Sequence, residues 1–134
     1  MASRTARQTI EQALKRIGIL SEEESMTAPQ SVDGLAQLND LMQGFPSRGI
    51  QYVHETLTLD SALNVPDEQT RNVMLMLAWE MADGYGKTLS AKLVADIMEA
   101  KGALQAFYFE VPPAQIDDGL QNRLLRGSSS IQRI

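Results

Sequence analysis

The chain has 134 residues, 43% of them hydrophobic, and its 17 acidic and 12 basic residues give a net charge of −5. This length suits one domain with a substantial core, while the lack of cysteine excludes disulfides and thiolate zinc sites. The acidic balance disfavours a protein that coats nucleic acid with its whole surface. No apolar run approaches the length of a membrane span, and the N-terminal residues lack the apolar stretch of a signal peptide.

Residues 3–17 are predicted to form a first amphipathic helix that ends at Gly18. One face is apolar, with Ala6, Ile10, Ala13, Leu14 and Ile17. The opposite face is mainly basic, with Arg4, Arg7 and Lys15 beside Glu11. We interpret this face as solvated, and a contact with DNA remains the alternative.

A second helix is predicted from Thr27 to Gly44, because Thr27 followed by Pro29 is a typical helix start. Its predicted buried stripe consists of Val32, Leu35, Leu38, Met42 and Phe45. Asn39 lies at the edge of this stripe, and a buried amide needs partners, so we expect it to hydrogen-bond the backbone of a nearby loop.

Residues 50–65 change from helical spacing to alternation of apolar and polar residues, which predicts a short extended β arm or hairpin. Two short strands are unstable alone, so we expect residues 51–59 to project from the helices and contact a partner. The candidate contact residues are Tyr52, Val53, His54 and Leu57. His54 is the only histidine, which makes a metal or catalytic site unpromising, and we expect an exposed polar side chain.

The central helix is predicted over residues 67–86, with Pro66 and Asp67 at its start and two glycines at its end. One face carries a core stripe of Val73, Met74, Leu77, Ala78 and Met81. Met76 and Trp79 fall outside this stripe, so the helix is apolar on nearly all sides. Their cover is either another segment of the chain or a neighbouring subunit, and we predict a subunit interface.

A fourth helix is predicted to end near residue 109, with its buried face formed by Leu93, Ile97, Ala100, Leu104 and Tyr108 and widened by Val94 and Met98. The fold class is therefore all-α, a four-helix bundle in residues 1–110 with the arm at 50–65. Residues 111–134 are polar, with dispersed apolar anchors, and predict a flexible C-terminal tail that orders on binding.

No enzyme motif is present: the chain lacks a phosphate-binding glycine loop, a nucleophile elbow and an H-E-x-x-H pattern. We therefore expect a protein without enzymatic activity, cofactor or metal.

Four segments carry a resemblance to a known family: TARQTIEQALKRIGIL, VDGLAQLNDLMQGF, LTLDSALNVPDEQTRNVMLMLAWEMADGYG and LVADIMEAKGALQ. Their order and spacing over residues 5–108 resemble the head-to-tail adaptors of tailed phages, which include tail accessory, head-completion and packaged-DNA stabilisation proteins. The pieces IGIL, LNDLM and VPDE are the most specific. Phe45 stands where the family leads us to expect tryptophan.

The resemblance implies a helical subunit of the virion, made in the host cytoplasm, that forms a homo-oligomeric ring of twelve copies beneath the portal protein. Such a ring extends the DNA channel without sequence-specific binding, retains the packaged genome until ejection and docks the next tail component. The tail is then expected to bind the portal through Arg123, Leu124, Leu125, Arg126, Ile131, Arg133 and Ile134. The alternative is a small helical protein–protein interaction module unrelated to virions.

Overall fold

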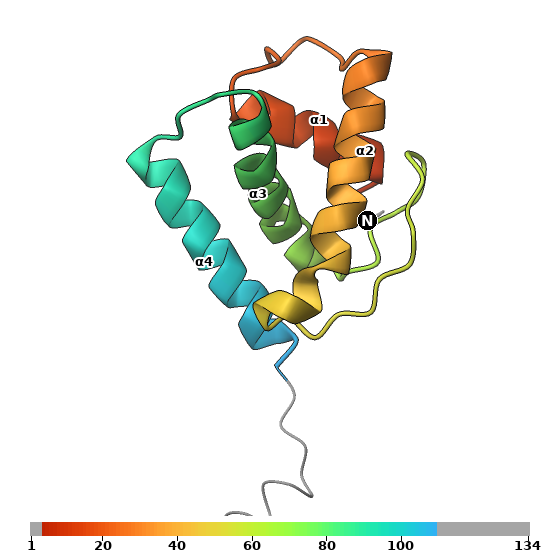
Figure 1. The fold of residues 1–134 in the computed structure, drawn as a ribbon, viewed down its shortest axis with the longest axis vertical. Coiled ribbons are helices and arrows are strands. Elements are labelled where there is room, and N and C mark those ends of the chain that lie inside the picture. Colours follow the sequence, from red (N-terminus) through yellow and green to blue (C-terminus); the bar gives the residue numbers. More distant parts are fainter. Residues whose placement is uncertain (1–3, 110–134) are drawn as a thin grey trace, which may run out of the picture.

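The computed structural model describes residues 4–109, which form four α-helices and one short 3-10 helix (Figure 1). In chain order the elements are α1 (Ala6–Arg16), α2 (Ala28–Gln43), η1 (Phe45–Arg48), α3 (Asp67–Gly84) and α4 (Ala91–Phe107). The predicted all-α class is confirmed for this part of the chain. The predicted tail, with all its portal-binding residues, lies outside the described residues.

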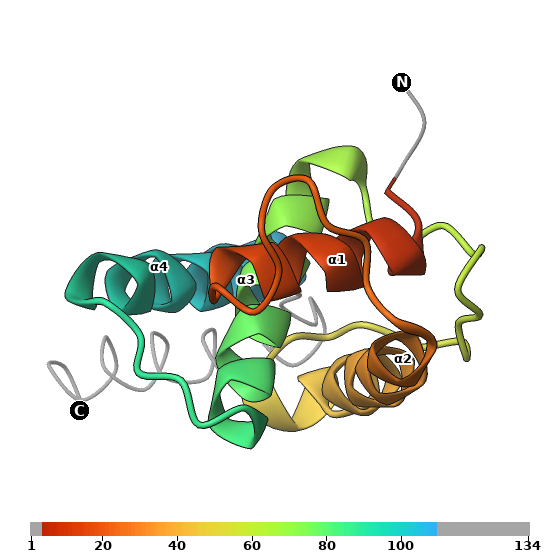
Figure 2. The ribbon, with the colours of Figure 1, turned by 90° about the horizontal axis from the view of Figure 1, so that it is seen from above.

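Helix α3 is the centre of the fold, because α1, α2 and α4 all pack against it. Figure 2 shows α1 crossing α3, with α2 and α4 lying on opposite sides of α3, and α1 also packs against α2. Every residue from Val73 to Ala78 is buried, so the helix is covered almost all round. None of the helices in residues 4–109 is both long and apolar enough to cross a membrane.

Local signals set the helix ends largely where the sequence indicates. Thr5 and Thr27 each form a capping box, with Gln8 and Gln30 respectively, and Ser90 caps α4. Each side-chain oxygen accepts a hydrogen bond from a backbone amide that has no partner within the helix. Gly18 has a positive φ of 81°, which allows the chain to turn sharply after α1.

The face that α2 buries is rotated relative to the prediction. Leu38, Met42 and Phe45 are buried as expected, but Val32 is 66% exposed. Gly34 lies inside instead, against the side chain of Ile10, so α1 and α2 approach closely there. This close approach turns α2 so that Val32 points outward. Met98 of α4, also predicted to be buried, is exposed.

The predicted β arm is not found: residues 4–109 contain no strand, and the pairing of Thr5 with Ala62 is an isolated bridge. The backbone groups of this segment serve helices instead. The amides of Ala6 and Arg7 donate to the carbonyls of Ser61 (2.8 Å) and Leu59 (3.0 Å). These are the first two amides of α1, which lack partners within their own helix.

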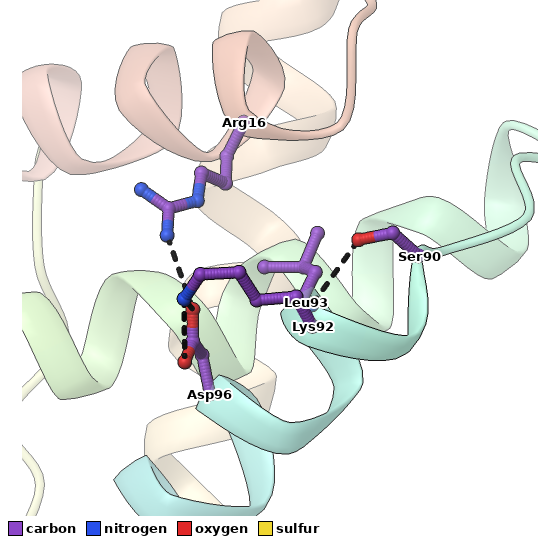
Figure 3. Close-up of polar contacts among 5 residues, drawn as sticks. All are labelled: Arg16, Ser90, Lys92, Leu93 and Asp96. Atoms are coloured by element: carbon purple, nitrogen blue, oxygen red, sulfur yellow. Dashed lines mark hydrogen bonds and ion pairs between the residues drawn. The ribbon is translucent and has the colours of Figure 1, made fainter.

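An ion-pair group joins two of the outer helices, α1 and α4 (Figure 3). The carboxylate of Asp96 is shared between Arg16 of α1, at 3.5 Å, and Lys92 of α4, at 3.2 Å. Because these groups are partly exposed, the contact orients the helices more than it stabilises them.

Replacement of Gly34 tests the close approach of α1 and α2. An alanine Cβ there would overlap the Cγ2 atom of Ile10, whose side chain is completely buried and stiff at χ1. Overpacking costs about 1–3 kcal/mol, which exceeds the gain of up to about 1 kcal/mol in helix propensity. We therefore expect Gly34→Ala to lower the free energy of unfolding in urea denaturation.

The matched control is Gly102→Ala on α4, where an added Cβ meets no atom within 4 Å. This variant should gain roughly 0.5–1 kcal/mol from helix propensity alone. Stabilisation of similar size in both variants would show that the two helices are not in tight contact.

Candidate functional site

The first candidate surface is a small hollow where α4 and η1 meet α3. Its volume is about 120 Å³, and it is lined by Arg48, Met76, Trp79, Ile97, Met98 and Lys101. Trp79 and Met98 are the exposed apolar members of this set, whereas Met76 and Ile97 form its buried floor. An apolar floor with two large exposed side chains at the rim is typical of a protein contact surface.

Of the two predicted interface residues, the structure leaves only Trp79 accessible. Met76 is 3% exposed because α4 packs against this side of α3. The expectation that Met76 lies on a face left open by its own subunit is therefore wrong. Trp79 is 37% exposed, so about two-thirds of its surface is already covered.

Two cations border this hollow, and one of them is fixed in place. Arg48 Nη2 lies 2.6 Å from Glu80 Oε1, and the carbonyl of Arg48 accepts a hydrogen bond of 2.7 Å from the Gln105 side chain. These bonds tie η1 to α3 and α4. Lys101 forms no ion pair within residues 4–109. The sequence pattern did not single out Arg48 or Lys101, because both are distant from Trp79 along the chain.

The second candidate surface is the segment between η1 and α3, which Asn39 holds on the helices. Asn39 Oδ1 accepts from the Leu57 amide at 2.8 Å, and Asn39 Nδ2 donates to the Leu57 carbonyl at 3.2 Å. The side-chain amide thus satisfies both backbone groups of one residue, as a neighbouring strand would. The expectation that Asn39 bonds a loop backbone is confirmed.

His54 extends this network and is not the exposed residue that we expected. Its Nε2 lies 2.8 Å from Asn39 Oδ1, and its Nδ1 lies 3.3 Å from the Tyr52 hydroxyl. The Asn39 oxygen can only accept, so the neutral ring carries its hydrogen on Nε2 and accepts from Tyr52 at Nδ1. Burial lowers the pKa of His54, although Glu55 acts in the opposite direction.

The residues predicted to contact a partner through the arm divide into two groups. Tyr52 and Leu57 belong to the core, and burial is the main reason why the pKa of Tyr52 is raised to about 12. The prediction that residues 51–59 project is wrong for these two side chains. Val53 is 84% exposed and remains available to a partner. Apolar and polar residues therefore alternate along this segment because one side of it packs on the helices, and not because it pairs as a strand.

The described residues do not include a group of three or more His, Cys, Asp or Glu side chains arranged to hold a metal ion. The two surfaces offer packing and hydrogen bonding, and we identify no nucleophile paired with a base. Comparison of the chain with models of known protein families and with curated proteins finds no match.

Loss of the Asn39 side chain should release the segment around Leu57. Asn39→Ala leaves the amide and carbonyl of buried Leu57 without these partners, which should cost about 2–3 kcal/mol of unfolding free energy. Urea denaturation measures this loss. Gln37→Ala is the matched control on the same helix, because Gln37 makes no hydrogen bond within residues 4–109. Equal effects of the two substitutions would contradict the assigned role of Asn39.

The lowered pKa of His54 predicts a loss of stability in acid. The ordinary pKa of 6.5 applies to the unfolded chain, so between this value and the lower folded pKa the unfolded state binds more protons. The contribution of His54 is complete above about pH 6.5 and falls as the pH decreases towards the folded pKa. His54→Gln keeps a side-chain donor for Asn39 but does not titrate.

We therefore expect the difference in unfolding free energy between the wild type and His54→Gln to shift in favour of the variant as the pH falls from about 7.5 to 5. A difference that is constant over this range would show that His54 titrates normally in the folded protein.

Proposed function

We propose that this protein is a non-enzymatic head-to-tail adaptor of a tailed phage, which forms a ring beneath the portal protein at the head–tail junction. In that place it extends the DNA channel, retains the packaged genome and docks the next tail component. The proposal depends on the resemblance of residues 5–108 in order and spacing. The observed helix order supports it, because each quoted segment overlaps one of the four α-helices.

The observation that carries the assembly part of the proposal is the exposed Trp79 beside Met98 on α3 and α4. In a ring every subunit uses the same two patches, so an accessible apolar residue is repeated at each contact. Trp79 is rigid and amphipathic and is typical of residues that dominate binding energy in interfaces. The finer features, namely twelve subunits, an arm contact through Val53 and a portal-binding tail, belong to the same proposal.

The alternative is a small helical interaction module unrelated to virions. The same apolar hollow would then bind a different protein. Assembly with the portal distinguishes the two, because only the adaptor requires a ring on that partner.

The test measures mass by native mass spectrometry after mixing the protein with the portal protein encoded in the same genome. We expect the wild type to form a complex with a ring of subunits, and Trp79→Glu to prevent it while keeping its helical circular dichroism. The remaining third of the Trp79 surface is worth up to about 1 kcal/mol per contact, and a buried unpaired carboxylate adds a larger penalty.

Val32→Glu is the matched control, because it also places a carboxylate at an exposed apolar position, on α2. It should assemble normally. If both variants bind the portal like the wild type, Trp79 is not at the subunit interface. If the wild type does not bind the portal, the adaptor proposal is wrong.

A further inference from the structure

A second hollow, on a different side of α3, concentrates positive charge in an acidic protein. It lies between α1 and α3, has a volume of about 420 Å³, and is lined by Arg4, Lys15, Arg16 and Arg71. Glu22 is the one acidic side chain in its lining, so four positive charges and one negative charge leave a net charge of +3. The whole chain has a net charge of −5.

Three of these four cations have no ionic partner in the described part of the chain. Arg16 is paired with Asp96 across to α4 (Figure 3), whereas Arg4, Lys15 and Arg71 form no ion pair there. Like charges that converge without partners repel one another. Their repulsion would be relieved by an anion bound between them.

Arg4 supplies a second, independent observation. Its Nη1 atom is buried and makes no hydrogen bond among the described residues. The backbone of Arg4 is held firmly, because its carbonyl accepts a hydrogen bond of 2.9 Å from the Leu63 amide and the next residue pairs with Ala62. Buried polar groups of proteins nearly always have partners, so Arg4 carries donor capacity that no described residue satisfies.

The chemistry of the lining favours phosphate oxygens. Arginine forks bind phosphate through parallel hydrogen bonds, and lysine adds a point charge. The volume falls in the range of small-molecule sites and leaves room for more than one phosphate group. Met74, which is almost fully buried, adds an apolar wall on which a sugar or base could pack.

We propose that the hollow between α1 and α3 binds a phosphate group through Arg4, Lys15 and Arg71. The group belongs either to a free nucleotide or to a nucleic-acid backbone, and both present the same oxygens. This site does not depend on the proposed adaptor function, because its argument uses only the charges and burial of these side chains.

The experiment has two arms that separate the two sources. In the first, inorganic phosphate and a nucleoside monophosphate are titrated into ¹⁵N-labelled protein, and amide shifts around the hollow are followed by NMR. In the second, a fluorescent DNA duplex is titrated and its anisotropy is measured. Three contributing cations predict that DNA affinity falls about 40-fold between about 50 and 200 mM salt.

Arg71→Ala is expected to weaken, by about tenfold, the binding of whichever probe binds the wild type, since it removes one charge-assisted contact. Arg7→Ala is the matched control, because Arg7 also lies on an exposed helix surface but pairs with Asp60 away from the hollow. Glu22→Gln should tighten binding, because it removes the opposing negative charge. A gain of affinity cannot result from unfolding, so this variant is decisive if Arg71→Ala folds poorly.

Nucleotide binding without DNA binding assigns the site to a free ligand, and DNA binding assigns it to a nucleic-acid backbone; either result supports a phosphate site. The proposal is overturned if inorganic phosphate, the nucleoside monophosphate and the DNA duplex all fail to bind. Equal losses in Arg71→Ala and Arg7→Ala overturn it as well, because they indicate general charge attraction. Equally tight binding of polyglutamate would show that the hollow recognises carboxylates of an acidic protein instead.

Discussion

The fold depends on the need to cover α3 on all sides. Six consecutive residues of this helix, from Val73 to Ala78, are buried, and such a sequence cannot lie on the surface of a small protein. Helices α1, α2 and α4 each pack against it, and η1 is tied to it by Arg48 and Glu80. Trp79 follows immediately after this covered stretch and is the point where the cover becomes incomplete.

The backbone groups of the segment between η1 and α3 are hydrogen-bonded although the segment forms no strand. Buried backbone groups need hydrogen-bond partners, and in this segment the partners are amides at the start of α1 and a side chain of α2. Its carbonyls at Leu59 and Ser61 accept from the first amides of α1, while Asn39 satisfies both backbone groups of Leu57. The same segment holds the backbone of Arg4 through the Leu63 amide, so it also positions one wall of the basic hollow.

Two surfaces with different physical character lie on different sides of α3. The hollow at Trp79 is bordered by α4 and η1 and has an apolar floor, which suits contact with another protein. The hollow at Arg71 is bordered by α1 and is lined mainly by cations, which suits an anion. The two hollows have no lining residue in common, so a molecule in one does not occupy the space of the other.

The sequence alone determined the helices and their ends, since capping residues, glycines and apolar spacing act within a few positions of the chain. It also determined the core stripe of α3 and the backbone contact of Asn39. Tertiary packing decided the rest. The contact of Gly34 with Ile10 turned Val32 outward, α4 covered Met76, and helix termini replaced the expected strand partner. Arg4 and Arg71 are far apart in the chain, so only the crossing of α1 over α3 brings them to one hollow.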